Sequence, residues 1–178
     1  NNIVLYTNNN SGNFAKTGNS IRVEFNTNEE VNNPIVQFNV GDNKIPGNTM
    51  EQENSTSQKK WISFFNVTNN HLNGNVTVNI SLTDLASNIT STNVLTSGSV
   101  TINNVHPTIT LKNYGNTDKV NVSLELGSQY NEAGAEGTHD IDIVSNLDTN
   151  VLGAHVITYS STSNSGNTTT KERTITIV

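Results

Sequence analysis

The feature that most constrains the fold of this chain is a strict alternation of apolar and polar residues. In the segment NVTVNISL, Val76, Val78, Ile80 and Leu82 alternate with Asn, Thr and Ser. Successive side chains of a β-strand point to opposite faces, so this period of two predicts a strand with one buried and one solvated face. No window of eleven or more residues has apolar residues at the spacing of an amphipathic helix, so an all-β chain is expected.

Alternating segments of this kind recur along the whole chain and are separated by Gly- and Asn-containing turns. In the first half they predict strands near 2–7, 20–26, 34–40, 59–67, 74–83 and 89–103, the last one broken at Gly98. In the second half they predict strands near 107–113, 119–126, 139–145, 153–162 and 167–178. Short strands with turn signals at this spacing are typical of β-sandwiches.

The segment NNVHP marks the expected domain boundary. Pro107 lacks a backbone donor and restricts His106 to extended conformations. The sequence therefore predicts two antiparallel β-sandwich modules in tandem, 1–105 and 106–178. Each half also ends in a strand, a small polar turn with Asn and a Thr-rich strand, which favours a two-module repeat.

Composition argues against several classes of function. Hydrophobic residues make up 32% of the 178 residues, charged residues 13%, and Asn about a fifth. The many β-branched residues distinguish the chain from a disordered one and predict thin sandwich cores. A net charge of −6 without a basic patch argues against nucleic-acid binding. No apolar run is long enough to span a bilayer, and the absence of Cys excludes disulfides and thiolate metal sites.

The second half resembles the immunoglobulin-like modules of bacterial and archaeal cell-surface proteins. The residues that carry the resemblance are, in order, PTITL at 107–111, YNEAGA at 130–135, LGAHVITY at 152–159, SNSGN at 163–167 and RTITIV at 173–178. Such a resemblance implies tandem immunoglobulin-like sandwiches of the kind found in adhesins, surface-layer proteins, stalks of secreted enzymes or virion decorations. It implies no reaction.

The first half resembles a related type of the same modules through AKTGNSIRVEF at 15–25 and DLASN at 84–88. It departs from that type at Asn19, where Asp is usual, and at Ser87, where Gly is usual. In the second half Ser163 stands where the family has Asp. These departures argue against calcium binding by the turns.

Calcium is the one cofactor that the residues suggest. Asp140, Asp142 and Asp148 form the densest acidic group with Glu132 and Glu136, and Ca²⁺ prefers such hard oxygen ligands. Strand alternation places Asp140 and Asp142 on the same face, so they could share an ion only if a loop supplied further oxygens. The three Asp residues are therefore the metal candidates, and no other cofactor is expected.

Catalytic motifs are missing from the sequence. There is no G-x-S-x-G elbow, no H-E-x-x-H, and no Ser with a plausible base, so the chain is not expected to be an enzyme. Trp61 shares one strand face with Ser63 and Phe65. That face is expected to fill the core; on the outer face, Trp61 would be a candidate contact for a protein or a sugar.

Glycosylation would have the largest effect on the surface. N-x-S/T sequons, which can accept N-linked glycans in a glycosylating host, begin at Asn9, Asn54, Asn66, Asn75, Asn79, Asn88, Asn121 and Asn167. In a chain this rich in Asn, Ser and Thr many sequons arise by chance, so they are candidates only.

These patterns together predict a non-catalytic structural or adhesive module of a longer extracellular protein on a cell or particle surface, where it acts as a spacer or lateral-contact unit. The expected partners are neighbouring domains of the same polypeptide, lattice neighbours and glycans, with no nucleic acid and no membrane insertion. Two alternatives stay open: a self-assembling surface-layer, virion or appendage component, and a carbohydrate-binding accessory module of a secreted enzyme.

Overall fold

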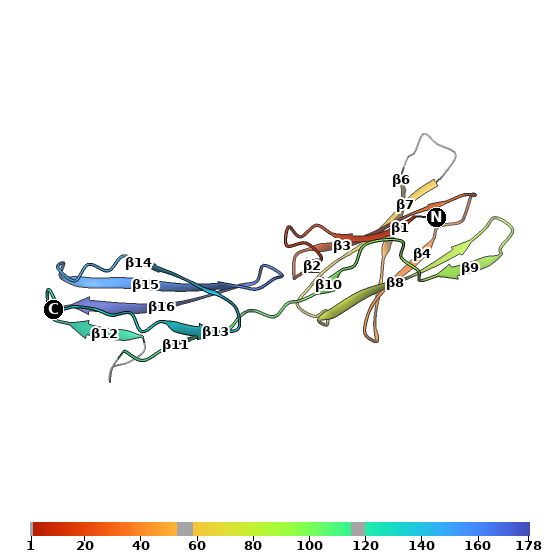
Figure 1. Cartoon of the computed structure of the whole chain (residues 1–178). Helices are drawn as coiled ribbons and strands as arrows, with labels where there is room; N and C mark the ends of the chain where they lie inside the picture. Colours follow the sequence, from red (N-terminus) through yellow and green to blue (C-terminus); the bar gives the residue numbers. More distant parts are fainter. Residues whose placement is uncertain (1, 53–58, 115–119) are drawn as a thin grey trace. The chain divides into compact units, whose positions relative to one another are not determined.

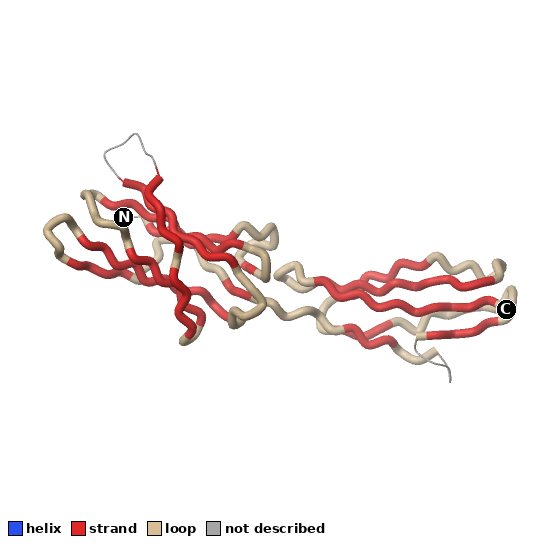
Figure 2. Tube along the Cα trace, turned by 180° about the vertical axis from the view of Figure 1, so that it is seen from behind, coloured by secondary structure: helices blue, strands red, loops and turns tan. Residues whose placement is uncertain are grey.

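The computed structural model describes residues 2–52, 59–114 and 120–178, and these form only strands and loops (Figures 1 and 2). They divide into two compact units, Asn1–Asn104 and Val105–Val178, here called unit 1 and unit 2. The predicted all-β fold of immunoglobulin-like sandwiches is confirmed. No helix that could cross a membrane occurs in the described part of the chain.

Unit 1 is a sandwich of two sheets (Figure 1). Its strands are β1 Ile3–Thr7, β2 Phe14–Ala15, β3 Ser20–Thr27, β4 Ile35–Val40, β5 Asn43–Pro46, β6 Asn48–Gln52, β7 Lys59–Asn66, β8 Gly74–Thr83, β9 Ile89–Thr92 and β10 Thr101–Ile102. One sheet has the order β1-β3-β7-β6, and the other has the order β2-β10-β8-β4-β5 with β9 paired to β8. The named strands pair antiparallel except β2 and β10, which are parallel.

The core of unit 1 follows the predicted alternation. Val76, Val78 and Ile80 of β8 are buried, whereas the intervening Thr77 and Asn79 are exposed. The rings of Phe38 and Phe65, one from each sheet, lie 4.9 Å apart at the centre of the core. Aromatic pairs at this separation stabilise a core beyond the area that they bury.

Trp61 lies in the core of unit 1 with 3% of its surface exposed. Its indole Nε1–H donates to the Thr27 hydroxyl, which is 3.4 Å away. The exposed ring that a ligand contact at Trp61 would need is therefore not present, and the residue packs the core instead.

Unit 2 is smaller. Its strands are β11 Ile109–Leu111, β12 Asn121–Leu124, β13 Ala135–Gly137, β14 Ile141–Ser145, β15 Gly153–Thr162 and β16 Thr168–Ile177. β11 pairs with β13, and a second sheet has the order β12-β16-β15-β14, in which β12 and β16 are parallel (Figure 1). The buried apolar core consists of Ile109, Leu111, Val122, Ile157, Tyr159, Ile175 and Ile177.

The structure differs from the sequence-based strands in two ways. The strands β2, β5, β6 and β13 were not predicted, and the predicted strand at 89–103 is two strands, β9 and β10, with an irregular segment between them. In that segment the chain leaves β8 and contacts β1, where the N–H of Leu5 donates to the carbonyl of Ser97 at 3.2 Å. Gly98 permits this contact because it has a φ of 84° and lies against the backbone of Leu5.

We expect Gly98→Ala to destabilise unit 1 by about 2 kcal/mol or more, because both strain and a clash result. A Cβ at this position would lie 1.9 Å from the carbonyl oxygen of Leu5, so β1 would have to move. Gly18→Ala is the matched control, since Gly18 also has a positive φ of 92° but nothing lies within 4 Å of its added Cβ. That variant should lose only about 1 kcal/mol. Urea unfolding followed by Trp61 fluorescence measures both, and equal losses would contradict the clash.

Candidate functional site

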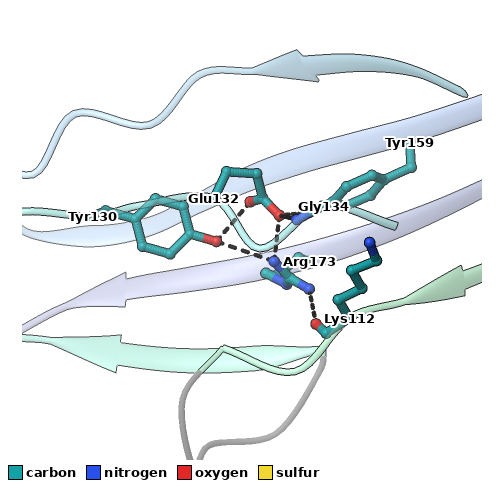
Figure 3. Close-up of polar contacts among 6 residues, drawn as sticks. All are labelled: Lys112, Tyr130, Glu132, Gly134, Tyr159 and Arg173. Atoms are coloured by element: carbon teal, nitrogen blue, oxygen red, sulfur yellow. Dashed lines mark hydrogen bonds and ion pairs between the residues drawn. The ribbon is translucent and has the colours of Figure 1, made fainter. Parts of the chain in front are cut away.

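A cluster of hydrogen-bonded charged and aromatic side chains lies inside unit 2 around Arg173 (Figure 3). The alternation of β16 places Arg173 on the same face as Ile175 and Ile177, and its side chain is fully buried. Its guanidinium forms an ion pair with Glu132 and donates to the carbonyl oxygen of Lys112. A buried cation of this kind is stable only when an anion and further acceptors surround it.

Glu132 comes from the loop between β12 and β13, and its side chain is 25% exposed. Besides Arg173, its Oε1 accepts hydrogen bonds from the Tyr159 hydroxyl at 2.5 Å and from the N–H of Gly134 at 2.6 Å. Its Oε2 accepts a hydrogen bond from the Tyr130 hydroxyl at 2.7 Å. Both oxygens of the carboxylate are therefore occupied by donors.

Two tyrosines contact the guanidinium, and a third stacks on one of them. Tyr159 is fully buried, and its ring centroid lies 5.6 Å from Cζ of Arg173. The Tyr130 hydroxyl accepts a hydrogen bond from Nη1 of Arg173 at 3.3 Å, and its ring stacks on Tyr114 at 4.7 Å. The Tyr159 ring thereby adds a cation–π contact to the ion pair.

The charges of the cluster are fixed near neutral pH. Burial alone would raise the pKa of Glu132, but the hydrogen bonds from Tyr130, Tyr159 and Gly134 and the charge of Arg173 outweigh it and lower that pKa below its ordinary value. Burial and the hydrogen bond to Glu132 raise the pKa of Tyr130 to about 12, and the same causes raise the pKa of Tyr159. The cluster therefore holds a permanent ion pair and offers no group that exchanges protons near pH 7.

The acidic residues proposed for calcium have different surroundings. Asp140, Asp142 and Asp148 are all exposed, and Oδ1 of Asp148 accepts hydrogen bonds from the N–H of Asn150 at 2.9 Å and from its Nδ2 at 3.2 Å. Glu132 is bound to Arg173, and Glu136 forms an exposed ion pair with a lysine. Among the described residues no three His, Cys, Asp or Glu side chains gather in a way that could hold a metal ion.

The sequons differ in accessibility. Asn54 lies outside the described residues, and Asn9 is half-buried. Asn167 is 6% exposed, and its amide donates to the carbonyl oxygen of Val105 at 3.2 Å and to the Ser165 hydroxyl at 3.0 Å. The exposed sequon asparagines are Asn66, Asn75, Asn79, Asn88 and Asn121. The side-chain amide of Asn88 donates to Asp84.

The same hairpin turn occurs once in each unit, at 84–88 after β8 and at 163–167 after β15. In the first, the N–H of Asp84 donates to the carbonyl of Asn88 at 3.0 Å, and the N–H of Asn88 donates to Oδ1 of Asp84 at 2.8 Å. In the second, the N–H of Ser163 donates to the carbonyl of Asn167 at 2.8 Å, and the N–H of Asn167 donates to the Ser163 hydroxyl at 3.1 Å. Asp84 and Ser163 thus close equivalent turns with different side chains.

The fourth residues of the two turns also share a backbone conformation. Ser87 has a φ of 70° and Gly166 a φ of 80°. Gly adopts this left-handed conformation without steric cost, whereas Ser pays for it. The Ser that departs from the family pattern therefore keeps the conformation that the usual Gly provides.

A groove of about 290 Å³ lies beside the first of these turns, in unit 1. Its apolar lining comes from Val31, Leu82 and Ile89, and Ile89 is 72% exposed. The polar lining consists of Thr27, Asn28, Glu29, Asp84, Asn88 and Thr90. Both carboxylate oxygens of Asp84 accept hydrogen bonds from Asn88, so this carboxylate belongs to the turn.

The Arg173 cluster was not predicted from the sequence, although its residues lie in the motifs YNEAGA at 130–135 and RTITIV at 173–178. The signal was in β16, because Arg173 has the same parity as Ile175 and Ile177 and so had to face the core. A buried Arg requires a carboxylate partner, but no local pattern points to Glu132, which is 41 residues away in the chain.

Residues 115–177 match a family model described as "Bacterial surface protein, Ig-like domain". A solved structure described as "Structures of Clostridium thermocellum CbhA fibronectin(III)-like modules" aligns with 97% of this chain and 93% of that chain, with a TM-score of 0.40 and 14% identity. No curated protein sequence matches the chain. The family similarity therefore covers most of unit 2, and the architecture of unit 1 is established by its own strand pairing.

We expect Glu132→Gln to destabilise unit 2 by about 2–3 kcal/mol, because it leaves the buried charge of Arg173 unpaired. Hydrogen exchange of the β15 and β16 amides measures the loss, while Trp61 fluorescence should show unit 1 unchanged. Glu136→Gln is the matched control, because the ion pair of Glu136 with Lys112 is exposed and contributes little. A loss as small as that of the control would contradict this role of Glu132.

The wild type and Glu132→Gln together test how the stability of unit 2 depends on pH. The pKa of Glu132 is lowered from its ordinary value of 4.5 in the folded state, so its contribution is complete above that value and is lost as the pH falls through the folded-state pKa. The stability difference between the wild type and Glu132→Gln should therefore shrink once the pH falls below about 4. A difference that stays constant at acid pH would show that charge is not its cause.

Proposed function

We propose that this chain is a non-catalytic structural module of a longer extracellular protein, which acts as a spacer on a cell or particle surface. The similarity of unit 2 to the immunoglobulin-like domains of bacterial surface proteins supports the surface setting. Such folds carry many functions, so the argument must come from the strands themselves.

The observation that carries the proposal is the parallel pairing of the last strand of each unit with an early one. In unit 1, β10 pairs parallel with β2. In unit 2, β16 pairs parallel with β12 over four residue pairs, from Asn121↔Thr174 to Leu124↔Ile177. Backbone hydrogen bonds extend this ladder at both ends. The N–H of Thr174 donates to the carbonyl of Val120 at 2.7 Å, and the N–H of Leu126 donates to the carbonyl of Val178 at 2.9 Å.

This pairing suits a chain that carries tension along its length. When the two ends of a unit are pulled apart, parallel strands near those ends slide along each other. All hydrogen bonds between them are then loaded together, whereas an antiparallel hairpin opens one bond at a time. A module built in this way resists extension, as a spacer must.

We expect Leu126→Pro to lower the force at which unit 2 unfolds, because it removes the donor of the Leu126–Val178 hydrogen bond. Leu126 is the second residue of a tight turn closed from Ser128 to Glu125, with Gly127 at a φ of 77°, and Pro is well tolerated there. Single-molecule stretching of the full chain measures the force, with unit 1 as internal control. An unchanged force for unit 2 would contradict the proposal.

A second candidate, lateral contact between copies, is favoured by strand β14. It forms the open edge of its sheet, and Ile143 and Val144 are 47% and 68% exposed on it. The strand carries no Lys, Pro or bulge, and Asp142 is its one charged residue. If copies pair along β14, the wild type should associate at high concentration in light scattering and Val144→Lys should stay monomeric. A wild type that is monomeric throughout would contradict this candidate.

A further inference from the structure

The two equivalent turns differ in what covers them. In unit 2 the side chains of Ser163, Ser165 and Asn167 are buried, and the segment 105–107 lies against them. In unit 1, Asn88 and its neighbour Ile89 are exposed and border the groove. A turn that is covered in one unit and open in the other indicates a place where a chain segment can bind.

The contacts in unit 2 define how such a segment is held. The amide of Asn167 donates to the carbonyl oxygen of Val105 at 3.2 Å, and the hydroxyl of Thr169 donates to that of Pro107 at 2.7 Å. Nδ1 of His106 lies 3.1 Å from the carbonyl oxygen of Thr168. The segment is thus extended, offers backbone carbonyls to an Asn and a Thr, and runs parallel to the start of β16.

Unit 1 has an Asn and a Thr at the positions that correspond to Asn167 and Thr169 of unit 2. Thr83 pairs with Ile89 and Leu82 with Thr90, as Thr162 pairs with Thr168 and Ser161 with Thr169. This register makes Asn88 and Thr90 the equivalents of Asn167 and Thr169. Both line the groove, and Leu82, Val31 and Ile89 beside them offer an apolar surface of the kind that buries a proline ring.

The direction of β1 shows which chain segment reaches the groove. Ile3 is opposite Phe25 on β3, so the chain leading into β1 approaches the end of β3, where Thr27 lines the groove. On its other side β1 runs parallel to the segment before β10. The N–H of Thr96 donates to the carbonyl of Ile3, and the N–H of Leu5 donates to the carbonyl of Ser97. β9, which begins at Ile89 and includes Thr90, precedes this segment in the chain.

We propose that the groove of unit 1 binds the polypeptide segment that leads into β1. Asn88, Thr90 and the apolar surface of Val31, Leu82 and Ile89 hold this segment, as the turn at 163–167 and Thr169 hold residues 105–107 in unit 2. The inference rests on the proposed function, because it requires that a longer chain continue into unit 1. It adds that unit 1 binds the junction that precedes it, so that each module of the longer chain fixes its own linker.

The test adds six residues to the amino terminus of the full chain. One extension copies the junction sequence INNVHP from 102–107, and the other is a Gly-Ser segment of the same length. The junction extension should slow amide hydrogen exchange at residues 28–31 and 88–90 by about fivefold relative to the Gly-Ser extension, as expected for one or two added hydrogen bonds. Equal exchange in both proteins would overturn the proposal.

Two variants of the junction-extended chain locate the effect. Ile89→Glu places a charge on the apolar side of the groove and should abolish the slowing. Ile35→Glu is the matched control, because Ile35 is 71% exposed, close to the 72% of Ile89, but lies outside the groove, so the slowing should persist. Trp61 fluorescence verifies that unit 1 is folded in both variants. Slowing of exchange that persists in Ile89→Glu would contradict binding of the segment in the groove.

The chain without an extension separates this occupant from a second copy. If the groove binds another molecule of the same chain, exchange at 88–90 will slow with rising protein concentration in the unextended protein, and the proposal is then wrong. The stretching experiment on unit 2 does not involve the groove. Equal exchange in the two extended proteins, together with a high unfolding force of unit 2 that falls in Leu126→Pro, would therefore reject this inference and leave the spacer function intact.

Discussion

The buried guanidinium of Arg173 is the group on which the rest of unit 2 depends. Arg stays protonated in proteins, so its charge must be met by acceptors in place. Glu132, the Tyr130 hydroxyl and the Lys112 carbonyl meet it. The first two come from the loop between β12 and β13, and the third directly follows β11. A single side chain of β16 thereby fixes segments that the small apolar core could not hold by packing alone.

Unit 1 reaches the same architecture by other means. Its core is lined from both sheets and includes the Phe38–Phe65 ring pair, and Trp61 satisfies its indole N–H on Thr27 within the same layer. Burial of aromatic surface does there what the ion pair does in unit 2. The two units therefore differ in what fills their cores. A carboxylate with a lowered pKa occurs in both, because Lys60 and Tyr6 hold the pKa of Glu24 in unit 1 below its ordinary value.

Sequence patterns predict long strands well and short ones poorly, for a physical reason. The segment 74–83 has enough alternating positions to define a period of two, and β8 spans Gly74–Thr83. β2 and β10 have two residues each, and a period of two cannot be read from a pair. Their existence depends on partners far away in sequence, as the pairing of Thr101 with Phe14 illustrates. The same limit applies to the candidate site, since the parity of Arg173 is local but its bond to Glu132 is not.

The turns at 84–88 and 163–167 show why one position can be acidic in one module and a serine in the next. The carboxylate of Asp84 is half-buried, so solvent helps to support its charge while it binds the backbone and amide of Asn88. Ser163 is 6% exposed, and an unpaired carboxylate there would lose its hydration. A hydroxyl closes the same turn without that cost, by accepting from the N–H of Asn167. Turn closure thus explains the acid at position 84, and burial explains the serine at position 163.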